Sequence, residues 1–201
     1  IDEVNLLEDH LVDLLLDVAQ SGENVVEREG LSVRHASQFI LIGSGNPEEG
    51  ELRPQLLDRF GLSVEVLTPD TVDERIEVIK RRDDYDKHPE EYAATWDKEN
   101  RKLRNKIQNA RKSLGSITVD SKILDHCAQI CIDLGSDGLR GELTLVRTAR
   151  ALAAFNGKER VDVGHIKTIA PMALSHRLRR DPLDDAGSGT RVERSVQKII
   201  G

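Results

Sequence analysis

Aromatic residues, cysteines and long apolar runs are scarce in this chain of 201 residues, and each scarcity excludes a class of protein. Phe, Trp and Tyr make up 3% of the chain and charged residues 32%, which favours a helix-rich protein over an all-β sandwich. Two cysteines are too few for a disulfide scaffold, and a reducing compartment suits them better. No apolar stretch approaches the roughly 18 residues of a membrane-spanning helix, and no basic, apolar-cored leader opens the chain.

An excess of basic residues is also missing. Lys and Arg number 29 against 36 Asp and Glu, so the formal net charge is −7. Proteins dedicated to duplex DNA usually carry a basic field that neutralises phosphates. The charge therefore argues against nucleic acid as the main partner.

Residues 1–82 are predicted to form part of an α/β domain. A short apolar run at 39–43 is typical of a strand buried in a parallel sheet, and the alternating residues 62–67 are typical of a second strand. The other patterns predict an amphipathic helix that Gly22 ends, a β-hairpin over 25–35, a short helix between Pro54 and Gly61, and a helix over 70–82 capped by Thr68 or Asp70.

The rest of the chain is predicted to be helical. Residues 83–116 are nearly all polar, and a continuous helix of about 25 residues from Glu90 would span about 37 Å, which suits a connecting arm. Residues 117–201 show four helical patterns that are typical of a small bundle. These patterns cover 119–134, 139–155, 162–179 and 189–200.

Two adjacent carboxylates, Asp2 and Glu3, follow an apolar residue at the expected end of a buried strand. Such a pair suits nucleotide hydrolysis, because one carboxylate can hold Mg²⁺ while the other orients and deprotonates an attacking water. Acidic pairs are also common on surfaces, so a solvated pair without a catalytic role is the alternative.

Asn46 lies in a glycine-rich loop directly after the predicted strand at 39–43. Its amide could position a water against a γ-phosphate. The alternative is a turn asparagine that caps its own backbone.

Two arginines are candidates for contacts with a nucleotide. Arg59 follows Asp58 on a short helix and could enter a neighbouring subunit as an arginine finger. The alternative is a surface ion pair with Asp58 or Glu51. Arg140 opens the second helix of the bundle, where the helix dipole disfavours a cation by less than ~1 kcal/mol, and this mismatch slightly favours a functional contact.

Three other features of the sequence are candidate sites. Cys127 and Cys131 share one face of a predicted helix, but two thiolates do not make a structural zinc site; core burial is favoured over redox sensitivity. The six histidines show no metal-binding spacing. The basic run 177–180 suits the end of a helix, and a contact with phosphate or an acidic partner is the alternative.

The order of these motifs resembles that of the AAA+ ATPases. Several longer segments resemble the small ATPase subunit of magnesium chelatase, the I subunit, in the form found in bacteriochlorophyll-making bacteria. The segments are 2–7, 26–30, 43–50, 52–61, 135–142 and 175–182.

The resemblance implies a role for each candidate residue. Asp2 is similar to the metal-side Walker B carboxylate and Glu3 to the catalytic one. Asn46 is similar to the sensor 1 residue, Arg59 to the arginine finger, and Arg140 to the sensor 2 arginine of the lid. The bound ligands would be ATP and Mg²⁺, with Asp2 on the metal and Asn46, Arg59 and Arg140 on the nucleotide.

The resemblance also implies a fold of mixed class, α/β plus all-α. Residues 1–82 would be the C-terminal part of an AAA+ αβα nucleotide-binding domain, 83–116 a long helical connector and 117–201 a helical lid. The family's phosphate loop, Gly-x-x-x-x-Gly-Lys-Ser/Thr, does not occur in the 201 residues. We therefore expect a fragment that starts at Walker B and is inactive alone, since it lacks the backbone cradle for phosphate.

The activity implied is ATP hydrolysis that drives Mg²⁺ insertion into protoporphyrin IX on a partner subunit. The chain would form a homo-oligomeric ring, expected to be a hexamer, and work with the D and H subunits in the cytoplasm, or in the plastid stroma of a photosynthetic eukaryote. No porphyrin site, nucleic acid or membrane span is expected on this chain.

Two alternatives remain open. One is another AAA+ ATPase of the same clade, helicase-like or chaperone-like, although few basic residues in the predicted hairpin could contact phosphates. The other is a ring-interaction module that hydrolyses nothing.

Overall fold

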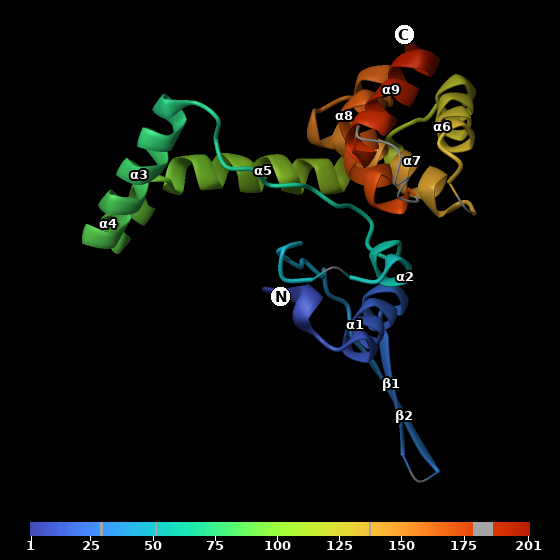
Figure 1. Ribbon diagram of the computed structural model, residues 1–201, viewed down its shortest axis with the longest axis horizontal. Coiled ribbons are helices and arrows are strands. Elements are labelled where there is room, and N and C mark those ends of the chain that lie inside the picture. Colours follow the sequence, from blue (N-terminus) through green and yellow to red (C-terminus); the bar gives the residue numbers. More distant parts are fainter. Residues whose placement is uncertain (29, 51, 137, 179–186) are drawn as a thin grey trace.

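The computed structural model describes residues 1–28, 30–50, 52–136, 138–178 and 187–201. Figure 1 shows three parts: a front segment (residues 1–63), an arm of three helices, and a helical lid (residues 117–201). The short helix α2 (Pro54–Leu57) lies on the side of the front segment that faces the lid. None of the helices in these ranges is long and apolar enough to cross a membrane.

The front segment has a small apolar core. Val12 and Leu16 of the first long helix pack with Val4 and with Leu56 of α2. Gly22 ends that helix in the left-handed conformation at φ 74°, as predicted. The elements are the 3₁₀ turn η1 (Val4–Leu6), α1 (Asp9–Ser21), β1 (Glu23–Arg28), β2 (Leu31–Ala36) and α2 (Pro54–Leu57).

The predicted β-hairpin is confirmed. Strands β1 and β2 pair antiparallel, from Glu23 opposite Ala36 to Arg28 opposite Leu31. Every residue of β2 is exposed, and Figure 1 shows the hairpin projecting from the front segment away from the lid. The hairpin is therefore held at its base alone.

The predicted strands at 39–43 and 62–67 are wrong as regular strands, because both segments are extended without a ladder. Ile40 is 88% exposed and Val66 is 89% exposed. A parallel strand is stable only when neighbouring strands pair with it and helices cover its faces, and the described residues supply little of either. What pairing there is joins Ile42 and Ser44 to the start of the chain. The Ile1 amino group donates to the Ile42 carbonyl at 2.7 Å, the Ser44 N–H donates to the Ile1 carbonyl at 2.9 Å, and the Ser44 carbonyl accepts from the Val4 N–H at 2.8 Å.

The arm is built from α3 (Val72–Lys87), α4 (Pro89–Thr95) and α5 (Asp97–Ser113), none of which contains a buried residue. The helix α3 begins at Thr71, whose side chain caps it by accepting from the Glu74 N–H, and not at Thr68 or Asp70 as predicted. The continuous helix predicted from Glu90 is also wrong, because the helix is interrupted at Trp96, between α4 and α5. The ring of Trp96 lies under the Arg81 guanidinium of α3 at 5.1 Å, and this contact fixes the chain at the break.

The lid is the helical bundle that the sequence predicts. Its helices are α6 (Ser121–Asp133), α7 (Arg140–Phe155), α8 (Val163–Leu174) and α9 (Ser188–Ile200), with the 3₁₀ turn η3 (Ser175–Arg177) after α8. Fully buried side chains from all four helices, among them Ile130, Leu145, Ile166 and Val192, form its core. Because the α8 pattern ends in η3, the helix stops at Leu174 and not at the predicted residue 179.

Candidate functional site

The Asp2 carboxylate and the Glu3 backbone are fixed against the loop that follows residues 39–43. The Ser44 hydroxyl donates a hydrogen bond to Asp2 Oδ1, and its oxygen accepts the Glu3 N–H at 3.2 Å. Glu3 adopts the left-handed conformation at φ 53°, which is uncommon for a residue other than glycine. Both residues are exposed, so the serine holds them in place while their free oxygens face solvent.

Two glycines allow the loop to approach this closely. A Cβ at Gly43 would lie 2.9 Å from Val4 Cγ1, and a Cβ at Gly45 would lie 2.8 Å from Asn5 Oδ1. Both distances are shorter than real Cβ contacts, so a side chain at either position would force the loop or the side chain of Val4 or Asn5 to shift.

Asn46 joins the same corner through Asn5. The Asn5 side-chain amide donates to the Asn46 carbonyl at 3.3 Å and to the Gly50 carbonyl at 3.1 Å. The side-chain oxygen of Asn46 accepts the Glu48 N–H at 3.1 Å, which is the turn-capping contact of the alternative reading. The structure therefore places Asn46 close to Asp2 and Glu3 with its side chain engaged in its own turn.

The corner suits a magnesium ion that arrives with phosphates. In the part of the chain that the structure describes, no cluster of three or more His, Cys, Asp or Glu residues could hold a metal ion by itself. Mg²⁺ in nucleotide sites is usually held by one or two carboxylates together with substrate phosphates. Asp2 and Glu3 provide oxygen donors of that kind.

Arg59 is folded onto its own subunit. Its guanidinium pairs with Asp13 and Asp17, one turn apart on α1, and its side chain is only 18% exposed. The ion-pair alternative thus describes this conformation, with different partners: Asp58 pairs elsewhere, and Glu51 lies outside the described residues. The sequence offered one signal for these partners, the spacing of four residues between the two aspartates.

Asp58, beside Arg59, joins the front segment to the lid. Its carboxylate accepts from the guanidinium of Arg140 at the start of α7 and from Arg177 in η3. A carboxylate near the first turn of α7 offsets the unfavourable position of Arg140 in the helix dipole. Sequence reasoning missed Asp58 as the partner of Arg140, and it treated Arg177 only as part of a basic run. Arg179 and Arg180 of that run lie outside the described residues.

The candidate residues therefore form two clusters and not one. Asp2, Glu3 and Asn46 meet at the Ser44 loop, whereas Arg59 and Arg140 are held at the turn around Asp58. Within the described ranges, the contacts of the two arginines are made with residues of the second cluster and of α1. A shared nucleotide site would need an arginine from another subunit.

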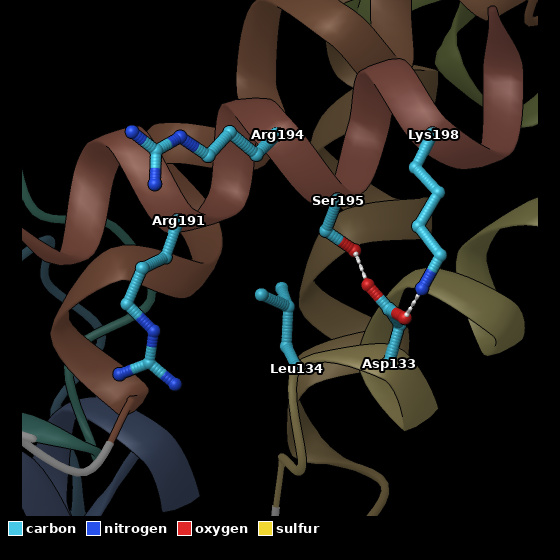
Figure 2. A pocket seen from close by; sticks show the side chains of 6 residues that line it. All are labelled: Asp133, Leu134, Arg191, Arg194, Ser195 and Lys198. Atoms are coloured by element: carbon cyan, nitrogen blue, oxygen red, sulfur yellow. Dashed lines mark hydrogen bonds and ion pairs between the residues drawn. The ribbon is translucent and has the colours of Figure 1, made fainter. Parts of the chain in front are cut away.

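A hollow of about 230 Å³ lies between α6 and α9 of the lid, and none of the residues that line it is a candidate predicted from the sequence. Figure 2 shows Ser195 and Lys198 of α9 pointing to the Asp133 carboxylate of α6; the Ser195 hydroxyl donates to it at 2.7 Å. The hydrogen bond from Lys198 holds the pKa of Asp133 below its usual value. These contacts tie the two helices together and indicate a structural role.

The two cysteines are buried, as predicted. Burial raises the pKa of Cys127 to about 11 and that of Cys131 to about 12. The thiolate is the reactive form of cysteine, so both thiols stay protonated and unreactive in the folded lid near neutral pH.

Comparisons with known proteins agree with this architecture. The AAA lid domain family matches residues 124–199. A crystal structure of a protein from Cytophaga hutchinsonii to which ATPase activity is ascribed superposes with a TM-score of 0.71 at 18% identity, covering 100% of this chain and 64% of that one. Together they confirm the predicted fold class, the C-terminal part of an AAA+ domain with a helical lid.

Closer sequence relatives are found among curated proteins. The chain is 64% identical over 200 residues to the magnesium-chelatase 38 kDa subunit of Cereibacter sphaeroides and 52% identical over 201 residues to that of Chlorobaculum tepidum. It is 50% identical over 200 residues to the chloroplastic magnesium-chelatase subunit ChlI of Nicotiana tabacum. All of this chain is matched in each case, but it spans 60%, 51% and 47% of the three relatives, respectively.

Proposed function

We propose that this chain, which is similar along its whole length to magnesium-chelatase 38 kDa subunits, works as part of the ATPase motor of that enzyme. ATP hydrolysis between subunits drives the insertion of Mg²⁺ into protoporphyrin IX, which a partner subunit binds. The observation that carries the proposal is the 64% identity over 200 residues to a subunit of that name. The corner of Asp2, Glu3 and Asn46 supplies groups that suit the chemistry.

In this proposal the first cluster works on the attacking side of the phosphate. Asp2, oriented by the Ser44 hydroxyl, and the phosphates would hold Mg²⁺, which when bound neutralises phosphate charge. Glu3 orients the water and takes its proton, and its exposed carboxylate is free to do so. Asn46 contributes its amide to the same water after leaving its turn contact with Glu48.

The second cluster works across the subunit interface. Arg59 leaves Asp13 and Asp17 and neutralises charge that develops on ATP held by the next subunit. Arg140 leaves Asp58 and contacts ATP from the lid. Both arginines are bound by carboxylates in this structure, so each has a defined resting position.

A site shared between subunits requires neighbouring copies of the chain, and the resemblance to magnesium chelatase suggests the rest of the assembly. We propose a homo-oligomeric ring, a hexamer, that works with the D and H subunits of the enzyme and carries no porphyrin site of its own. Residues 1–82 belong to the nucleotide-binding domain, 83–116 to the connector and 117–201 to the lid. The site of action is the cytoplasm, or the stroma in a plastid.

The deciding experiment uses the intact native protein with the substitutions Arg59→Ala and Glu3→Gln. Loss of an arginine finger lowers turnover by roughly 10³-fold or more, so Arg59→Ala is expected to leave only a small residual rate of hydrolysis while ATP binding and ring formation persist. Glu3→Gln is expected to trap bound ATP. Rings that mix the two variants should regain part of the activity, because some interfaces then combine an intact Glu3 with an intact Arg59.

Arg53→Ala is the matched control. Arg53 lies just before α2, pairs with Asp9 and is well exposed, so its loss should leave turnover unchanged. Normal turnover in Arg59→Ala would contradict the proposed role of Arg59 as the arginine finger. Mixed rings of proven composition without any regained activity would count against a site shared between subunits.

A further inference from the structure

The turn that carries Arg59 is docked on the lid by a dense set of hydrogen bonds. Arg177 Nη1 donates to Asp58 Oδ1 at 2.6 Å and also to the Asp58 carbonyl, and Arg177 Nη2 donates to the Phe60 carbonyl at 2.8 Å. His176 Nε2 lies 3.1 Å from the same Phe60 carbonyl. The Ser63 N–H donates to the Met172 carbonyl at 2.9 Å. Residues 58–63 thus lie along the end of α8 and the turn η3 and are hydrogen-bonded to both.

Arg177 is the central residue of this contact. Its side chain is 2% exposed, and its Nε donates to the Ala173 carbonyl at 2.9 Å, which fixes the plane of the guanidinium on its own helix. The two remaining nitrogens then face the carbonyls on either side of Arg59. A guanidinium can make such a planar fork of donors, whereas an ammonium group cannot.

Arg140 and Arg177 share Asp58 unequally. Arg140 reaches the carboxylate from a side chain that is 46% exposed. Arg177 binds the same carboxylate and also the backbone of the turn, from a buried position. If Arg140 moves to a nucleotide, Arg177 therefore still holds the turn and still neutralises Asp58.

We propose that Arg177 is a positioning residue for Arg59. It makes residues 58–61 and the lid one rigid body, so that a lid movement in one subunit moves the arginine that acts on the ATP of the next subunit. The inference rests on the proposed function, since it assigns Arg177 a role through the arginine finger. Arg177 itself does not touch the nucleotide.

The test is Arg177→Lys in the intact native protein, with Arg147→Lys on the exposed face of α7 as the matched control. We expect turnover to fall at least tenfold in Arg177→Lys, with ATP affinity within about twofold of the unmodified protein and the lid still folded by thermal unfolding. The control Arg147→Lys should leave turnover, ATP affinity and thermal unfolding unchanged.

Two further readouts separate positioning from a merely structural role. If Arg177 acts through Arg59, the double variant Arg59→Ala/Arg177→Lys should be no slower than Arg59→Ala alone. Rings that mix Arg177→Lys with Glu3→Gln subunits should regain activity as Arg59→Ala mixtures do, because each variant lacks a different half of the interface.

The inference is overturned by normal turnover in Arg177→Lys, or by a double variant in which the two losses multiply. If Arg177→Lys does not fold, Arg177→Gln, which keeps a side-chain donor, takes its place. Failure of both to fold beside a folded Arg147→Lys would make Arg177 a structural residue only. Normal turnover in Arg59→Ala would remove the proposed function and this inference with it, whereas a slow Arg59→Ala beside a fast Arg177→Lys removes the inference alone.

Discussion

The lid and the front segment differ in what stabilises them, although both carry residues of the proposed site. Among the described residues, the main core of the lid consists of 18 buried apolar side chains, whereas that of the front segment consists of four. The lid therefore has the interior of a small independent domain. The front segment is held largely by polar contacts: Ser44 with Asp2, Arg59 with α1, and Asp58 with the lid.

The comparison shows which part positions the other. A segment with so few buried side chains gains little stability from its own packing. The turn at residues 58–63 instead takes its place from hydrogen bonds to the lid. Within this 201-residue chain the lid is thus the better packed part, whereas Asp2, Glu3, Asn46 and Arg59 lie on the part with few buried side chains.

The largest effect is expected from Leu145→Ala in the lid. Leu145 is fully buried, and truncating a buried leucine lowers the free energy of unfolding by about 2–5 kcal/mol. Leu67→Ala, at a residue that is 73% exposed, should change it by less than about 0.5 kcal/mol. Chemical denaturation of the 201-residue chain, followed by circular dichroism, measures both.

Equal losses in the two variants would contradict the contrast between the packed core of the lid and the exposed extended residues 62–67 that follow the front segment. The same two substitutions in the intact native protein test whether residues 62–67 are also exposed there. A loss at Leu67 there, and not in the 201-residue chain, would show that residues 62–67 are covered in the native protein as a buried strand would be.

A smaller effect is expected when Asp13 and Asp17 are both replaced by asparagine. Removing the two carboxylates weakens the resting position of Arg59. Ion pairs of this kind contribute about 0.5–1 kcal/mol, so turnover in the intact protein should rise about two- to fivefold. Steady-state hydrolysis measures the change, and Asp9→Asn on the same helix, which breaks the pair with Arg53, serves as the control. Unchanged turnover would show that Arg59 is not restrained by α1.

The smallest effect concerns pH and His176, which packs against the turn at Phe60. Burial lowers the pKa of His176 below its ordinary value of 6.5. The unfolded chain therefore binds a proton more readily than the folded chain, so stability is fully present above pH 6.5 and is lost as the pH falls through the lowered pKa. Melting temperatures between pH 7.5 and 5 should drop less in His176→Gln than in the unmodified chain. Parallel curves would contradict this role.

Local signals in the sequence predicted much of the fold. The hairpin, the end of α1 at Gly22 and the four lid helices all depend on neighbouring residues, through turn chemistry and apolar periodicity. Arg140 at the start of α7 and the buried cysteines of α6 were predicted for the same reason. These features need no information about distant parts of the chain.

Long-range contacts could not be predicted in this way. The expected strands at 39–43 and 62–67 depend on partners that lie far away along a chain. Arg177 and Asp58 are 119 residues apart, and the pairing of Arg59 with Asp17 spans 42 residues. The sequence identified the candidate residues by type and order, but the resting position of each arginine required the structure. The roles of Asp2, Glu3, Asn46, Arg59 and Arg140 stay predictions.

The break in the arm at Trp96 has an optical consequence. Trp96 is the single tryptophan of the 201 residues, it is partly exposed, and it contacts Arg81 of α3 across the junction between α4 and α5. Indole emission from this chain therefore comes from the arm alone, far from the Ser44 loop and from the core of the lid. Any rearrangement that separates α3 from the start of α5 would change the wavelength and intensity of the Trp96 emission. The rearrangement could therefore be observed without an added dye.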